Sequence, residues 1–300
     1  MNKFTKGVMV VFLSSTFLTA CGTTRESKFE AAPTDTAAAT TEPTDGSAAL
    51  LTDAEGLWAE RSDQAKLEAA IAKWEEAAKT TADADLYLKL SRGHYFLGDG
   101  FYALQGDAEK RDAHYTIGLD WAEKALGLQA PDFVAALKGG AKHPEAILKA
   151  PPEAVPSMYW YATNLGKWAA SKGFATKLKY KDNIKATMLH VKSLDEKFFY
   201  AAPFRYFGAF EAATAGIAGG SLELSEKNFK KAVEMNPEYL GTKVLWADYL
   251  AKKQNNRELY EQLLKEVIEA NAAVDPAIEP ENKQEQAKAK KLLANIDDVF

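Results

Sequence analysis

The side chains that could take part in catalysis or metal binding include four histidines and one cysteine. Histidine acts as a general base or a metal ligand, and a cysteine thiolate is a nucleophile. No two histidines stand four residues apart, the spacing that places two metal ligands on one helix face. A metal site formed by His94 and His114 from facing helices stays open, beside the alternative of core or solvated histidines. The four histidines are His94, His114, His143 and His190.

Sequence motifs of the common catalytic classes do not occur in this chain. It contains no HExxH, no GxSxG and no phosphate-binding Walker A loop. Acidic pairs such as Asp297 and Asp298 are typical of a solvated helix end. We therefore expect no enzyme activity, no catalytic residue, no metal, and no cofactor other than a covalent lipid on Cys21.

Cys21 follows an amino-terminal segment with the layout of a signal peptide. Lys3 and Lys6 precede an apolar stretch, residues 7–17, which is too short to span the ~30 Å hydrocarbon core of a bilayer as a helix. The residues LTAC, 18–21, resemble the lipobox of a bacterial lipoprotein. This resemblance implies that the chain is cut before Cys21 and acylated on its sulfur. The alternative is an ordinary cleaved signal peptide with a chance cysteine.

Acylation would also explain why an exported chain has a single cysteine, which cannot form a disulfide within the chain. Several acyl chains, at ~0.8 kcal/mol per buried methylene, give a stable membrane anchor. Gly22 rather than aspartate follows the cysteine. By the same resemblance, this favours the outer membrane, with the protein facing the periplasm.

The composition divides the chain into three parts. Residues 21–48 are rich in Thr, Ala, Pro and acids, with Phe29 as their one large apolar side chain, and we expect a flexible tether. The predicted organisation is a signal peptide at 1–20, the lipidated cysteine and tether at 21–48, and a folded domain at 49–300. The chain is acidic, with a formal net charge of −5, which argues against nucleic acid or an anionic membrane surface as a partner.

The folded part shows helical periodicity nearly throughout, and no run alternates as a strand would. Leu259, Leu263 and Val267, for example, stand four apart. Small residues at Gly118, Ala122 and Ala125 match the second helix of a tetratricopeptide (TPR) repeat, although Ala-rich helices also give such matches by chance. We predict an all-α fold: a TPR-like solenoid of helical hairpins with degenerate repeats and a C-terminal capping helix.

An ordered series of segments adds a more specific resemblance. The series is LYLKLSRGHYFLGDG, GLDWAEKAL, YWYATNLGKWA, YFGAF, NFKKAVEMNPEYLGTKVLWADYLA, ELYEQLLKEVI and AKKLLANIDDVF. It resembles the TPR-containing T component of tripartite ATP-independent (TRAP) transporters, from about residue 50 to the end. The resemblance implies a lipoprotein that works with the solute-binding P component, an apolar organic ligand, and a ring-like homo-oligomer such as a trimer.

Two helices are candidates for lining a ligand cavity. The first, in VPSMYWYATNLGKWAASKG, begins after Pro156 and ends near Gly173. Its indoles, with an amide between them, could line an apolar pocket that contains one directional hydrogen-bonding group. The alternative is aromatic packing between repeats, with Asn164 bonded to a loop backbone. The residues proposed for the pocket are Trp160, Tyr161, Asn164 and Trp168.

The second candidate helix lies in APFRYFGAFEAATAGIAGG. Gly208, Ala212 and Gly216 stand four apart and form a small-residue ridge suited to close helix contact. Arg205 could attract the carboxylate end of a ligand, or pair instead with an acid or a helix C-terminus. The binding candidates here are Arg205, Tyr206 and Phe207.

Two functions follow from these observations. The first is a lipoprotein that binds the P component of a TRAP transporter and binds or relays an apolar ligand through an internal cavity. The second is a TPR scaffold for envelope or outer-membrane assembly, which would hold partner peptides in a concave groove. The first predicts Trp160, Asn164 and Trp168 at a cavity, and the second predicts them in ordinary core.

Overall fold

A computed structural model of the chain describes residues 22–29 and 45–300. Within these ranges the regular structure is helical, apart from isolated bridge residues at Thr81 and at the pair Ala215 and Gly220. The predicted all-α, solenoid-like fold is confirmed, while the TPR character of its repeats stays a prediction. The predicted signal peptide (1–20), Cys21 and residues 30–44, the larger part of the predicted tether, lie outside the described residues. None of the described helices is long and apolar enough to cross a membrane.

The first part of the domain is a series of helices packed on their neighbours in sequence. Aspartates begin several of them, because a side-chain carboxylate accepts the unpaired N–H groups of the first turn: Asp63 caps α2, Asp83 caps α3 and Asp107 caps α5. A π-helical turn, Leu97–Tyr102, joins α3 to α4. The helices are α1 (Asp45–Ala59), α2 (Gln64–Ala77), α3 (Ala84–Phe96), α4 (Ala103–Gln105), α5 (Ala108–Gln129), α6 (Pro131–Lys138), α7 (His143–Ala146), α8 (Val155–Ser171) and α9 (Phe174–Leu194).

The second part continues the array through α10 and α11, which pack on each other, and ends with the pair α13 and α14. A second π-helical turn, Trp246–Ala251, follows α12. Its helices are α10 (Phe198–Thr214), α11 (Leu222–Met235), α12 (Gly241–Leu245), α13 (Arg257–Glu269) and α14 (Glu279–Ala294).

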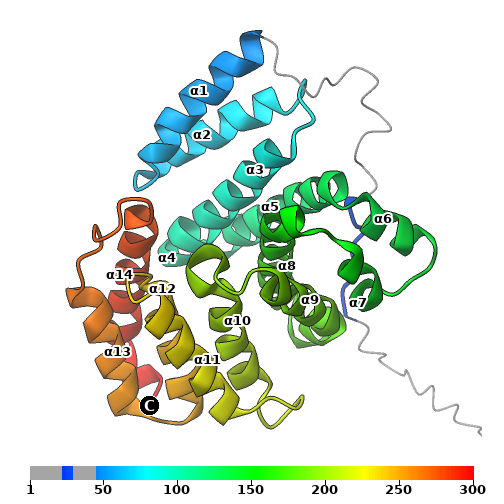
Figure 1. Cartoon of the computed structure of the whole chain (residues 1–300). Helices are drawn as coiled ribbons and strands as arrows, with labels where there is room; N and C mark the ends of the chain where they lie inside the picture. Colours follow the sequence, from blue (N-terminus) through cyan, green and yellow to red (C-terminus); the bar gives the residue numbers. More distant parts are fainter. Residues whose placement is uncertain (1–21, 30–44) are drawn as a thin grey trace, which may run out of the picture.

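The array curves until its last helix meets its first ones. Figure 1 shows α14 beside α4, and α14 also contacts the π-helical turn after α3. Glu281 of α14 binds two arginines: Arg61 Nη2 lies 2.8 Å from its Oε2, and Arg92 Nη2 lies 2.7 Å from its Oε1. Arg61 also donates to the carbonyl of Ala277 over 2.7 Å. The predicted capping helix therefore also joins the two ends of the domain.

The segment after Cys21 differs from the expected tether. Phe29 is only 5% exposed, and Arg25 forms ion pairs with Asp120 and Glu123 of α5. Gly22–Phe29 thus packs on the domain, because its one aromatic and its one arginine find partner side chains there. The domain also begins earlier than residue 49, since α1 starts at Asp45.

Gly208 lets α10 and α11 approach closely. A Cβ at this position would lie 2.7 Å from the ring of Phe229, and Ser225 Oγ donates to the Gly208 carbonyl over 2.6 Å. Ala212 is fully buried on the same helix. The third residue of the predicted ridge, Gly216, is not part of it, because α10 ends before it and Gly216 adopts a φ of +77° in a turn.

This contact gives a test of the fold. We expect Gly208→Val to lower the free energy of unfolding by ~1–3 kcal/mol, since the added methyl groups overpack the α10–α11 contact. Gly56→Val is the control, because a Cβ there meets nothing within 4 Å, and its effect should stay within ~0.5 kcal/mol. Urea titration followed by circular dichroism measures both. Equal stability of the two variants would contradict the packing.

Candidate functional site

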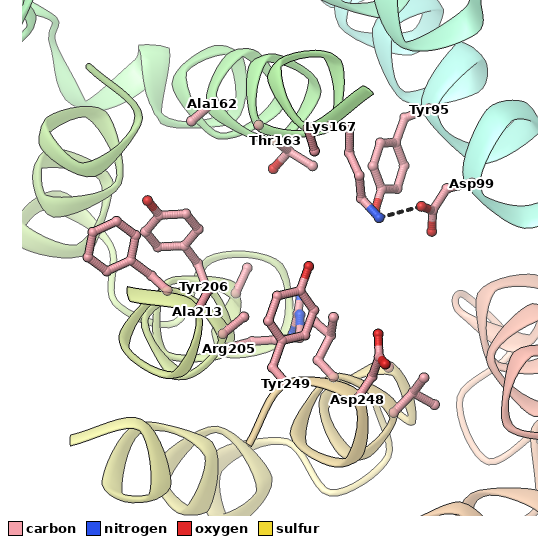
Figure 2. A pocket seen from close by; sticks show the side chains of 18 of the residues that line it. Tyr95, Asp99, Ala162, Thr163, Lys167, Arg205, Tyr206, Ala213, Asp248 and Tyr249 are labelled. Carbon is pink, nitrogen blue, oxygen red and sulfur yellow. Dashed lines mark hydrogen bonds and ion pairs between the residues drawn. The ribbon is translucent and has the colours of Figure 1, made fainter. Parts of the chain in front are cut away.

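A cavity of about 870 Å³ lies inside the curve of the helices. It is bounded by α3, α4, α8, α9, α10, α12 and α14, together with both π-helical turns. Its volume falls within the ~300–1,000 Å³ typical of small-molecule sites. Figure 2 shows side chains of α8 and α10 on opposite sides of it.

Small side chains on these two helices leave the space open. On α8 the lining residues Thr163, Gly166 and Ala170 recur at helical spacing, and on α10 Ala209 and Ala213 do the same. Large aromatic residues border this stretch. Trp160, for example, packs 5.3 Å from the Tyr95 ring and 5.5 Å from the Phe199 ring, centroid to centroid. The result is an apolar chamber with aromatic walls at one end.

Of the residues predicted to bind a ligand, three line this cavity and four do not. Trp160, Arg205 and Tyr206 border it. Asn164 is fully buried elsewhere, with its Nδ2 donating to Ser91 Oγ over 3.0 Å. The remaining three pack in the core: Tyr161 on Phe29 (5.2 Å), Trp168 on Tyr180 (5.4 Å) and Phe207 on Tyr206 (5.0 Å), centroid to centroid.

The geometry of the helix explains this division. Residues four apart on an α-helix are rotated by about 40°, so Trp168 is turned about 80° from Trp160. The stripe from Trp160 through Asn164 to Trp168 therefore winds from the cavity into the core. The cavity face of α8 is marked instead by Tyr159 and by Thr163 and Gly166, which follow it by four and seven residues.

Asp99 is a buried charged residue of the cavity wall that we did not single out from the sequence. It accepts from Lys167 Nζ of α8 and Lys288 Nζ of α14, both at 2.5 Å, and from the Tyr115 hydroxyl at 2.9 Å. Burial alone would raise the pKa of Asp99, but the two lysines hold it far below its usual range. The signal in the sequence was an aspartate between two glycines in LGDG.

Those glycines fit the π-helical turn that carries Asp99. A Cβ on Gly98 would lie 3.2 Å from the carbonyl of Arg111, and one on Gly100 would lie 3.3 Å from Gln284 of α14. The turn is thus pressed between α5 and α14. π-Helical turns frequently occur at functional sites, and this one directs a carboxylate at two other walls of the cavity.

Arg205 is the buried cation on the opposite side of the cavity. Its guanidinium lies 4.1 Å from the Tyr239 ring centroid and donates to the carbonyls of Tyr200 (2.8 Å) and Phe199 (3.3 Å). Within 22–29 and 45–300, no carboxylate lies within ion-pair distance of it. Neither predicted pairing of Arg205, with an acid or with a helix C-terminus, is what the structure shows.

The carbonyls that Arg205 binds belong to a strained turn. Phe199, Tyr200 and Ala201 have φ angles of 43°, 56° and 56°, in the left-handed region that non-glycine residues avoid. Tyr200 is also held by a 2.7 Å hydrogen bond from its hydroxyl to Asp275. Such strain persists only where the surroundings fix the backbone, and it tends to cluster at functional sites.

Tyr206 brings a second polar group to this side of the cavity. Its ring stacks 5.7 Å from that of Phe210, centroid to centroid. Its buried hydroxyl has no hydrogen-bond partner among the described residues. Burial raises the pKa of Tyr206 far above its usual range, so the phenol stays protonated and can donate.

The structure brings together the two histidines of the metal site that the sequence left open. His94 and His114 do come together, with their Nδ1 atoms 2.9 Å apart, and His94 Nε2 lies 3.2 Å from Glu75. Burial lowers the pKa of His114 to about 4, which favours its neutral form. However, the described part of the chain holds no group of three or more side chains suited to a metal ion.

The fold and the cavity define a class: an all-α, solenoid-like protein with a cavity of small-molecule size inside its curve. A family model described as TRAP transporter T-component matches residues 95–300, which carry nearly all of the cavity lining. The match covers more than half of the chain, so the chain belongs to the TRAP transporter T-component family. The predicted resemblance is confirmed, and the chain belongs among the accessory components of TRAP transporters. A search of curated proteins finds no match.

The Asp99 cluster predicts a specific loss of stability. Asp99→Asn leaves Lys167 without its counter-charge and Lys288 with Glu285 alone. Because the two lysine side chains are 37% and 21% exposed, we expect the substitution to lower the free energy of unfolding by ~1.5–3 kcal/mol. Asp182→Asn is the control, because that side chain is 74% exposed. Chemical denaturation at pH 7 compares them, and equal effects would show that the cluster does not stabilise the fold.

The same cluster predicts a dependence on pH. The folded-state pKa of Asp99 is depressed, so its stabilisation is complete above its unfolded pKa of ~4 and is lost as the pH falls further. The free energy of unfolding should therefore fall more steeply between about pH 5 and 2 in the native protein than in Asp99→Asn. Denaturation curves across this range measure the difference, and parallel profiles would refute the assignment.

Proposed function

We propose that the protein binds an organic molecule with an apolar body in this cavity and exchanges it with the solute-binding P component of a TRAP transporter. The observation that carries the proposal is the chamber of about 870 Å³, enclosed by the two ends of the array and lined by small and aromatic side chains. Binding is non-covalent, and burial of apolar surface supplies its affinity.

The charges around the cavity support a ligand with an anionic end. Lys167 and Lys288 are paired with Asp99, Lys288 also with Glu285, and Arg92 with Glu281. Lys177 and Lys291 have no described carboxylate partner, but they are exposed. Arg205 differs from them because it is buried, and its described partners are carbonyls, an aromatic ring and the Tyr159 hydroxyl. A ligand carboxylate would form an ion pair with the buried Arg205 guanidinium, and the Tyr206 hydroxyl would donate a hydrogen bond to the same carboxylate.

The sequence supplies the rest of the proposal. Cys21 is lipidated after removal of residues 1–20, and the protein is anchored to the outer membrane and faces the periplasm. It assembles as a homo-oligomer, for which a trimer is the form that the family resemblance suggests. These statements rest on the lipobox and the family resemblance.

The second candidate function is a scaffold for envelope assembly. One observation favours it: Asn164 and Trp168 lie in ordinary core rather than at the cavity. Against it, α14 closes the array through Glu281, whereas a scaffold of this kind would hold peptides in an open groove.

Filling the cavity tests the ligand proposal. We expect Thr163→Trp to abolish the organic molecules that mass spectrometry detects on protein purified from its own membranes, because the indole occupies the chamber. Leu189→Trp adds the same side chain at a 49% exposed site on α9 and should leave them in place. Circular dichroism checks that both remain helical. Unchanged ligand content in Thr163→Trp would contradict binding in this cavity.

The anionic end can be tested without mutation. Alkyl chains of equal length that end in a carboxylate or in an alcohol should differ at least ~10-fold in affinity, since a charge-assisted hydrogen bond contributes ~1.5–3 kcal/mol. Calorimetric titration measures both ligands. Equal affinity would remove Arg205 from the binding site.

Association with the P component is tested separately by cross-linking in intact envelopes, where recovery of scaffold partners alone would favour the second function.

A further inference from the structure

Gly22–Phe29, which we call the amino-terminal strap, packs against the folded domain and is hydrogen-bonded to it at several points. Figure 1 shows it in blue beside α6 and α7. The backbone N–H of Thr23 donates to Thr176 Oγ1 over 3.0 Å, that of Arg25 to the Tyr180 hydroxyl over 3.2 Å, and that of Lys28 to Glu123 over 2.6 Å. The strap is therefore hydrogen-bonded to α9 at its beginning and to α5 near its end.

Arg25 supplies the positive charge that the buried carboxylate of Glu123 needs. Its guanidinium binds Asp120 and Glu123, and its Cζ lies 5.9 Å from the ring centroid of Trp168. The side chain of Glu123 is only 2% exposed, and a buried carboxylate is costly without a cation. Arg25 supplies that cation, so the domain carries a charge that the strap neutralises.

Phe29 fills a socket at the other end of the strap. Its ring centroid lies 5.1 Å from that of Phe133, 5.2 Å from that of Tyr161 and 6.4 Å from that of His143. Gly127 allows the backbone to come close, since a Cβ there would lie 2.6 Å from the Phe29 carbonyl oxygen. The arginine site and the aromatic socket together fix the strap in one position.

The strap begins on a surface unlike the rest of this acidic protein. A Cβ on Gly22 would lie 2.7 Å from the carbonyl oxygen of Ala175, so the strap starts on the first turn of α9. There Phe174 is 64% exposed and Leu178 50%. Four lysines lie in residues 172–181 of a chain whose formal net charge is −5. Lys181 pairs with Asp182 and Lys179 binds Thr24 of the strap, while Lys172 and Lys177 have no ion-pair partner among the described residues.

We propose that the strap holds the beginning of α9 against the surface of the bilayer in which Cys21 is anchored, so that Phe174 and Leu178 enter the lipid interface. The inference rests on the proposed lipidation. Gly22 is bonded directly to Cys21, so lipidation there would attach acyl chains one residue from the contact between the strap and this turn. The lysines match anionic headgroups, as in other basic and apolar membrane-binding surfaces.

This orientation places the cavity next to the bilayer. Phe174, Lys177 and Leu178 also line the cavity, so the proposed membrane-contact surface is one of its borders. A ligand with an apolar body could then pass between the bilayer and the chamber without crossing water. By fixing this orientation, the strap would give the chamber access to ligands dissolved in the bilayer.

The test uses the full-length acylated protein in vesicles of phosphatidylethanolamine and phosphatidylglycerol. Cys21 is the one cysteine of the chain, so after its acylation an introduced cysteine is the only free thiol. We expect an NBD fluorophore at Leu178→Cys to lose about half of its fluorescence when the lipids carry bromine on their acyl chains. Val274→Cys, 59% exposed in the loop before α14, is the control and should lose none.

A second set of variants separates the strap from the anchor. Arg25→Ala with Phe29→Ala should leave the protein acylated and floating with the vesicles but abolish the quenching at Leu178→Cys. Glu26→Ala, an exposed position in the same segment, should leave the quenching intact. Circular dichroism checks the fold of each variant.

Mass spectrometry of Cys21 distinguishes two kinds of failure. An unmodified cysteine would overturn the proposed lipidation and this inference with it. Acylated, vesicle-bound protein whose Leu178 probe is not quenched would overturn the inference alone. Quenching that persists in the double variant would show that the contact does not depend on the strap and would overturn its role.

Discussion

Asp99 binds Lys167 of α8 and Lys288 of α14 from the π-helical turn between α3 and α4, and all three side chains border the cavity. Three walls are thus tied by one buried carboxylate. The buried Asp99 carboxylate needs the two lysines, because the protein interior solvates its charge poorly. The ion pairs therefore add to the aromatic packing of Trp160 on Tyr95 and Phe199 in joining the walls of the chamber.

On the far side of the cavity, the buried charge is held by backbone carbonyls and not by ion pairs within the described residues. Arg205 satisfies its donors with carbonyls of a left-handed turn, which leaves its charge without a carboxylate among the described residues. The same side chain stabilises an unfavourable backbone conformation and borders the chamber. A substitution of Arg205 would therefore change the shape of the wall as well as its charge, and a variant ligand is a cleaner probe than a variant residue.

The sequence predicts the helical class, the extent of α8 and the family, because helical periodicity and local motifs are short-range signals. It identifies Trp160, Arg205 and Tyr206 as cavity candidates. Asn164 and Trp168 lie in the core, the position that the alternative interpretation of this helix gives them, since a spacing of four drifts around the helix. Asp99 was missed because its partners lie 68 and 189 residues away. The packed strap was missed for a similar reason, as Arg25 meets acids 95 and 98 residues further along the chain.

The closure through Glu281 has a consequence for how the protein is made. Arg61 and Glu281 are 220 residues apart, so the contact joins the turn between α1 and α2 to α14, which is synthesised much later. The earlier helices can pair with their neighbours as they emerge, but the chamber has no complete wall until α14 arrives. Long-range closure of this kind forms late, which leaves the future lining exposed to water during folding. Nascent chains halted before α14 would therefore display an aromatic surface that chaperones recognise.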